Sequence, residues 1–127
     1  MLCRTGLFIG PSDGIVIEAR PLPRPVTARY LGMITPLIKR TTRHQFAQIG
    51  GVLQAGPRPI TIGGLPGVEL RGTGLSFAGA RIHSTIVYAF HDRTEYFVNC
   101  QYTPQHATQV RRACDQILRT FQVSTAR

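Results

Sequence analysis

Two alternating strands followed directly by an amphipathic helix constrain the fold of this chain most strongly. The pattern predicts strands over Arg81–Phe90 and Glu95–Tyr102, joined by a turn at His91–Thr94, which together form an antiparallel hairpin. A helix is expected over Thr103–Phe121, with the threonine as N-cap, a proline at the first helical position and one apolar stripe. We therefore expect the hairpin at the centre of a sheet, with this helix docked on it.

The hairpin register stays open in the sequence. A two-residue loop at Asp92-Arg93 would pair Tyr88 with Phe97, whereas a three-residue loop would pair Tyr88 with Val98. Apolar side chains fall on both faces of the hairpin, so the sheet needs cover on both sides. The predicted fold class is α+β, with a central antiparallel β-sheet flanked by helices as an αβα sandwich.

The rest of the chain supplies weaker signals. A strand is expected at Ile15–Ala19, a helix from Thr27 to about Arg43 that is broken or kinked at Pro36, and a loop-rich stretch followed by short strand pieces at Ile60–Ile62 and Val68–Leu70. We expect one domain over residues 13–123, a poorly ordered N-terminal extension over 1–12 and a tail over 124–127. No apolar stretch approaches the roughly 20 residues of a membrane-spanning helix.

Two of the three cysteines fall on the hairpin and on the helix that follows it. Cys100 and Cys114 can face one core, and a strand that turns into a helix packed on it can bring the sulfurs within bonding reach. A disulfide is the favoured interpretation, two buried free thiols are the alternative, and Cys3 is left over near the terminus. Zinc held with His106 is disfavoured, since the spacing matches no strong metal motif.

Fifteen basic residues stand against six acidic residues, so the formal net charge is +9. This excess predicts attraction to anionic partners such as nucleic acid, anionic lipid or acidic polysaccharide. The alternative is a solvated surface with a compositional bias, because every cation except Lys39 is arginine and no long basic block occurs. Charge alone leaves both interpretations open.

The densest cationic run contains Lys39, Arg40, Arg43 and His44. No acidic residue occurs over positions 19–68, so these charges lack local carboxylate partners. Arginine suits bidentate capture of phosphate, sulfate or carboxylate, and the histidine adds charge only when protonated. If an anionic ligand exists, we expect it at these four residues.

Motifs of catalysis are weak. Gly74–Gly79 resembles a nucleophile elbow, but its second glycine comes one residue late, and Gly72–Gly74 lacks the third glycine of a dinucleotide fingerprint. His91-Asp92 is typical of a turn rather than of a general base with its orienting carboxylate. We expect no catalytic residue, no metal ligand and no cofactor, and an enzymatic role is disfavoured but left open.

The C-terminal half carries a family-like succession of segments: Ile62–Glu69, Ile86–Phe90, Arg93–Val98 and the helix end Ile117–Phe121. In element order it resembles the PsbP/Mog1-like domains, particularly those of secreted actinobacterial lipoproteins of the LpqN/LpqT kind. The resemblance implies an antiparallel sheet between helices, export to the cell envelope, and service as a binding or accessory module without a catalytic set.

The expected function is a non-catalytic cell-envelope binding or accessory module, with an envelope protein, anionic lipid or glycan as partner. The alternatives are a small cytosolic anion- or nucleic-acid-binding protein and, less favoured, a small hydrolase. The expected location is extracellular or in the envelope, since a disulfide needs an oxidising compartment. Met1–Phe8 carries no export signal, so we expect a mature region or a mis-started reading frame in preference to a cytoplasmic protein.

Overall fold

The computed structural model describes residues 3–76 and 78–123. Along the chain the elements are β1 (Cys3–Gly10), β2 (Asp13–Pro21), α1 (Ala28–Gln48), β3 (Leu53–Ile62), β4 (Leu65–Leu75), β5 (Arg81–His91), β6 (Thr94–Tyr102), the 3₁₀ helix η1 (Pro104–His106) and α2 (Ala107–Thr120). Residues 124–127, the expected tail, lie outside the described residues. No helix in the described ranges is both long enough and apolar enough to cross a membrane.

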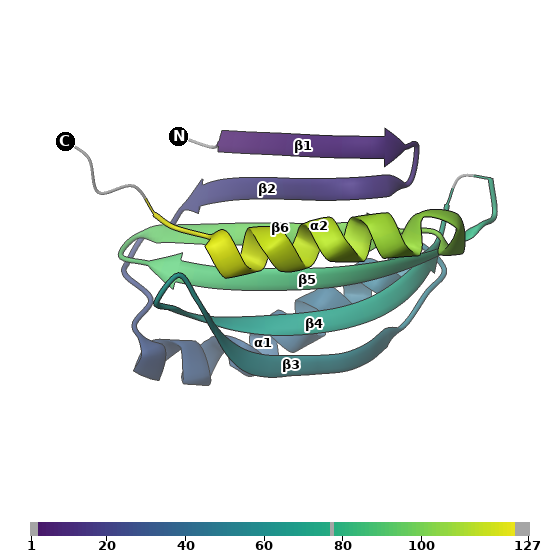
Figure 1. The fold of residues 1–127 in the computed structure, drawn as a ribbon. Helices are drawn as coiled ribbons and strands as arrows, with labels where there is room; N and C mark the ends of the chain where they lie inside the picture. The colour runs from purple at the N-terminus through teal and green to yellow at the C-terminus, as the bar shows by residue number, and fades with distance from the viewer. Residues whose placement is uncertain (1–2, 77, 124–127) are drawn as a thin grey trace.

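The strands form one antiparallel sheet in the order β1-β2-β6-β5-β4-β3. Figure 1 shows α2 in front of this sheet and α1 behind it. Both faces of the central strands carry apolar side chains, so each face needs a helix to exclude water. The predicted fold class, an antiparallel sheet flanked by helices, is confirmed.

The β5–β6 hairpin has the two-residue loop. Tyr88 pairs with Phe97 and His91 with Thr94, which leaves Asp92 and Arg93 as the loop. Asp92 adopts a φ of 50°, a left-handed conformation that aspartate tolerates better than most residues. This register places Phe97 on the α1 face and Val98 on the α2 face.

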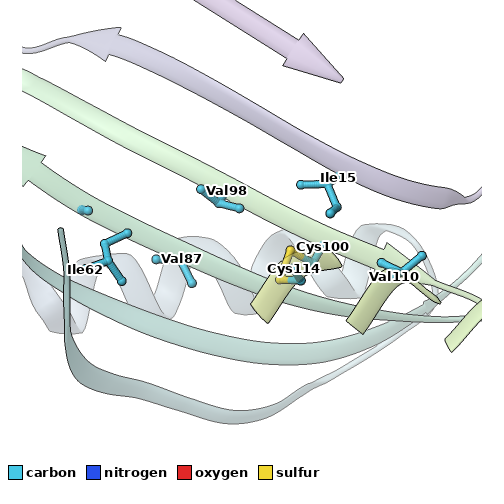
Figure 2. Packing of buried hydrophobic residues seen from close by; sticks show 8 residues of the cluster. Ile15, Ile62, Val87, Val98, Cys100, Val110 and Cys114 are labelled. Atoms are coloured by element: carbon cyan, nitrogen blue, oxygen red, sulfur yellow. A yellow bond between two sulfur atoms is a disulfide. The ribbon is translucent and has the colours of Figure 1, made fainter. Parts of the chain in front are cut away.

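Two separate cores lie on the two faces of the sheet. The core under α2 contains Val87, Val98 and Cys100 from the hairpin and Val110 and Cys114 from α2, as Figure 2 shows. Cys100 and Cys114 are joined by a disulfide with an S–S distance of 2.08 Å. The helix is therefore linked covalently to the central strand on which it packs.

The N-terminal segment differs from expectation. The expected poorly ordered extension 1–12 contains β1, which pairs with β2 along its length and forms one edge of the sheet. The Phe8 ring packs over Gly6 and Gly14, whose missing side chains leave room for it. Cys3 is the first residue of this strand and pairs with Ala19 of β2. Its backbone is therefore part of the sheet, and not of a frayed terminus.

Helix α1 is continuous, so the expected break at Pro36 was wrong. Thr27 caps the helix by accepting a hydrogen bond from the Tyr30 backbone N–H at 3.1 Å. Pro36 removes the donor that would meet the Gly32 carbonyl, but both residues lie on the exposed side of α1, where water can satisfy that carbonyl.

Two further boundaries needed correction. The loop-rich stretch before Ile60 belongs to β3, an edge strand whose prolines and register shifts are typical of a protected sheet edge. Thr103 makes no side-chain cap to the helix that follows. Its hydroxyl and backbone N–H instead donate to the buried Asp13 carboxylate, at 2.9 and 2.6 Å, and tie β2 to the end of β6.

Candidate functional site

The predicted anion-binding residues lie together on α1. Lys39, Arg40, Arg43 and His44 are all exposed, and their spacing places them on one stretch of the helix surface. In the described ranges, no ion pair within 4.0 Å involves any of the four. They therefore form an exposed cationic surface on α1.

A second cationic region lies on the opposite face of the sheet and is hollow. Helix α2 runs along β6 and β5, with β4 and β3 to one side of it (Figure 1). The strip of sheet beside the helix borders an open hollow of about 800 Å³. We call this the arginine groove. It is lined by Ile60, Thr61, Ile62, Gly63, Glu69, Thr108, Arg111, Arg112, Asp115, Leu118 and Arg119.

Glu69 is the buried acidic group at the floor of this groove. It lies in β4, directly opposite Arg58 of β3, and Arg71 projects from the same face of β4 two residues later. The Glu69 Oε1 atom accepts from Arg58 at 3.0 Å and lies 3.3 Å from Arg71 Nη2. One carboxylate thus orients two guanidinium groups and leaves them with an excess positive charge.

The α2 wall supplies the three cations that line the arginine groove itself, whereas Arg58 and Arg71 border an adjoining cavity of about 360 Å³. Arg111, Arg112 and Arg119 border the groove and are exposed, and Asp115 is the acidic residue among them. Arg111, Asp115 and Arg119 stand at four-residue spacing on α2, but no ion pair within 4.0 Å joins them in the part of the chain described. Arg119 Nε donates instead to the Asp115 backbone carbonyl at 3.3 Å.

Guanidinium groups with free N–H donors in a hollow suit an oxyanion. Each can donate two parallel hydrogen bonds to carboxylate, phosphate or sulfate. A smaller cavity of about 240 Å³ continues from Glu69 beneath α2 to the disulfide. The groove can therefore hold an anionic group at its rim and a further part of a ligand inside.

Sequence reasoning missed this site because its members come from three elements. Glu69 and Arg71 share one face through the alternation of a strand, a signal present in the sequence. Arg58 joins them only through the register of β3 against β4, and the expected loop at that position hid the pairing. The α2 arginines have the four-residue spacing of an ordinary solvent-exposed helix face, which by itself does not indicate a site.

The residues considered for hydrolysis do not come together. Ser76 precedes β5 and His91 ends it, so the 11 residues of this strand separate them by roughly 35 Å at the usual rise per residue. Ser76 Oγ accepts the Ala80 backbone N–H, and the Asp92 side chain is 86% exposed in the hairpin turn. Each has a local structural role.

Tyr88 lies on the α1 face of the sheet and is buried, with its ring tilted against Phe97. Burial raises the pKa of its phenol, because the phenolate would lose its hydration there. The side chain of Thr42 and the positive charge of Arg20 lower this pKa. The negative charges of Glu95 and Glu18 raise it further. The folded protein therefore holds the phenolic proton more tightly than the unfolded chain does.

This difference predicts a loss of stability in alkali. The folded-state pKa lies above the ordinary value of 10.0, so the contribution of Tyr88 is intact below that pH and is lost as pH rises through the folded pKa. We expect the free energy of unfolding in urea to fall less steeply for Tyr88→Phe than for wild type between about pH 9 and about pH 11. Identical slopes would contradict the assignment.

No family model matches the sequence. No curated protein matches it either. Among solved structures, the fold is similar to PA94, a protein of unknown function from Pseudomonas aeruginosa, with a TM-score of 0.64 and 15% identity over 99% of this chain and 85% of that one.

It is also similar to LpqN, described as involved in cell envelope biogenesis of Mycobacterium tuberculosis, with a TM-score of 0.57 and 11% identity over 88% of this chain. The chain spans 64% of the length of that protein. At identities this low, the two TM-scores establish a common fold and nothing about function.

Proposed function

We propose that this protein is a non-catalytic binding or accessory module of the cell envelope, and that its arginine groove holds an anionic group of an envelope lipid or glycan. The observation that carries the proposal is the buried Glu69 carboxylate, which lines both the arginine groove and an adjoining cavity of about 360 Å³. Arg58 and Arg71 line that adjoining cavity and lie 3.0 and 3.3 Å from the Glu69 carboxylate. A carboxylate in that position fixes the guanidinium groups before a ligand arrives, which reduces the entropy lost on binding.

Two observations support an extracellular or envelope location. The Cys100–Cys114 disulfide is typical of proteins that fold in an oxidising compartment. The fold is shared with LpqN, whose description places it in cell envelope biogenesis. Both agree with membership of the PsbP/Mog1-like group of secreted domains, which we propose for this chain together with its location.

The α1 cations Lys39, Arg40, Arg43 and His44 are the competing anion-binding surface. They are exposed on the helix surface, so water competes for each charge. The arginine groove is favoured because three arginines of α2 line a hollow there, and the buried carboxylate of Glu69 holds two more guanidinium groups beside it. Both surfaces remain candidates, and substitutions of equal charge separate them.

The test compares Arg111→Glu/Arg112→Glu in the groove with Arg40→Glu/Arg43→Glu on α1. Each pair lies on an exposed helix surface and lowers the net charge equally. We expect the groove variant to bind heparin and phosphatidylglycerol vesicles at least about tenfold more weakly than wild type, because two donors become repulsive. The α1 variant should lose less, and wild-type binding should weaken with salt.

Three outcomes would count against the proposal. A larger loss in the α1 variant would move the anion site to Arg40 and Arg43. Preference for DNA or RNA over heparin and vesicles at matched salt would favour the nucleic-acid-binding alternative. Turnover of ester, phosphate or glycoside substrates that disappears in Ser76→Ala or His91→Ala would favour a hydrolase.

A further inference from the structure

A second cavity, unrelated to the arginine groove, lies on the α1 face of the sheet. Helix α1 packs on β4 and β3, and the sheet extends beyond it toward β6 and β2. The segment 22–26, which leads from β2 to α1, closes the third side and leaves a cavity of about 360 Å³. This volume lies in the range of small-molecule sites, about 300–1,000 Å³. The cavity is lined by Arg20, Leu22, Pro23, Arg24, Val26, Tyr30, Ile34, Leu37, Ile38, Thr41, Gln45, Tyr88 and Glu95.

One end of this cavity carries a cluster of two arginines and two glutamates whose charges balance: Arg20 contacts Glu18 and Glu95, and Arg4 Nε lies 3.5 Å from Glu18 Oε1. Arg20 donates to Glu18 at 2.8 Å and to Glu95 at 3.2 Å, and its guanidinium lies 4.5 Å from the centre of the Phe97 ring. These contacts hold the guanidinium in place and meet its charge within the protein. Arg20 and Glu95, which line the cavity, still present N–H donors and carboxylate acceptors. They can therefore form hydrogen bonds to a polar group that carries no charge of its own.

The walls are apolar and partly aromatic. Tyr88 and Tyr30 contribute rings, and Val26, Ile34 and Ile38 contribute aliphatic surface. Leu37 borders the cavity and is 53% exposed, so it offers apolar surface at the mouth of the cavity. A flat apolar ligand would cover that surface and stack on the rings.

We propose that this cavity binds a neutral aromatic molecule of one or two rings that carries one hydrogen-bonding group. The size of the hollow suits a compact ligand rather than a long chain. The charges of the cavity are paired with each other, so a buried ionic ligand would find no counter-charge. A neutral polar group needs none and requires only a hydrogen-bond partner. Arg24 lies at the exposed rim, where water screens it.

The chemistry can be tested with 2-naphthol, 2-naphthoate and 2-naphthylmethylamine, which are neutral, anionic and cationic probes of one shape. Titration calorimetry should show the tightest binding for 2-naphthol, even though the net charge of +9 attracts the anion to the protein surface. In NMR spectra, 2-naphthol should shift the ring signals of Tyr88 and Tyr30 and leave those of Tyr102, on the α2 face, unchanged.

A matched pair of α1 variants tests the location. Leu37 borders the cavity, whereas Met33 is also exposed, at 72%, and does not line it. We expect Leu37→Glu to weaken 2-naphthol binding at least about tenfold, and Met33→Glu to leave it within about twofold, because only the first places a charge against the ligand. Both sites are exposed, so both variants should fold, which circular dichroism checks.

The proposal is overturned if wild type shows no saturable binding of 2-naphthol, if 2-naphthoate binds as tightly as 2-naphthol, or if the two variants bind 2-naphthol equally. Binding that is lost in the groove variant Arg111→Glu/Arg112→Glu but retained in Leu37→Glu would also overturn it, by placing the ligand on the other face. Because the proposed arginine groove would also attract 2-naphthoate, the comparison of 2-naphthoate with 2-naphthol is made in the Arg111→Glu/Arg112→Glu variant. The other results do not depend on anion binding in the arginine groove.

Discussion

Truncation of Phe46 to alanine is expected to lower the free energy of unfolding by about 3–5 kcal/mol, the usual range for a fully buried phenylalanine. Phe46 is 3% exposed and lies among the few α1 residues that are buried. Its ring packs directly on Gly72 of β4: a Cβ added to that glycine would lie 2.5–2.6 Å from the ring atoms. The sheet beneath cannot collapse into the space left by the ring, because its backbone is fixed by strand pairing on both sides.

Urea denaturation followed by circular dichroism measures this loss. His44→Ala is the control, since His44 is exposed on the same helix and its truncation should change stability by no more than about 0.5 kcal/mol. A loss below about 1 kcal/mol for Phe46→Ala would mean that α1 does not pack on the sheet as described.

Loss of the Cys100–Cys114 disulfide is expected to cost about 3 kcal/mol, the chain-entropy value for a loop of about 15 residues. The bond closes the segment from β6 to α2, with a sequence separation of 14 residues, so its removal frees the unfolded chain. Both cysteines are nearly inaccessible, at 2% and 5% exposure, so reduction should require partial unfolding or a strong reductant. The expected fall in Tm is of the order of 10 °C.

Thermal unfolding of wild type with and without dithiothreitol measures the effect. Cys3→Ser serves as the control variant, because it removes the third thiol and should show the same difference between oxidised and reduced forms. The double variant Cys100→Ala/Cys114→Ala should resemble reduced wild type and become insensitive to the reductant. Equal Tm values for oxidised and reduced wild type would show that the bond contributes nothing to stability.

Local sequence patterns were sufficient to predict the strands and the helix in the C-terminal half of this protein. Alternation of apolar residues identified β5 and β6, and apolar spacing identified α2. Their direct succession was enough to bring Cys100 and Cys114 onto one core. These features depend on periods of two and 3.6 residues and on short connections, so neighbouring residues contain the required information.

Local sequence patterns did not predict the elements whose stability depends on partners far away in the sequence. The first strand has few apolar alternations of its own and becomes β1 because β2 offers it a free edge. Pro36 is compatible with a continuous α1 because the sheet lies on the other side of the helix. In β3, glycines and prolines that locally favour a loop are held extended by pairing with β4.

The candidate sites show the same division. The run from Lys39 to His44 was visible because its members are neighbours on one helix. The arginine groove needed strand register to place Arg58 beside Glu69, and it needed the docking of α2 to bring Arg111 over them. Local spacing is set by covalent geometry and can be read from the chain, whereas contacts between β3, β4 and α2 arise only when the tertiary structure buries their shared surfaces.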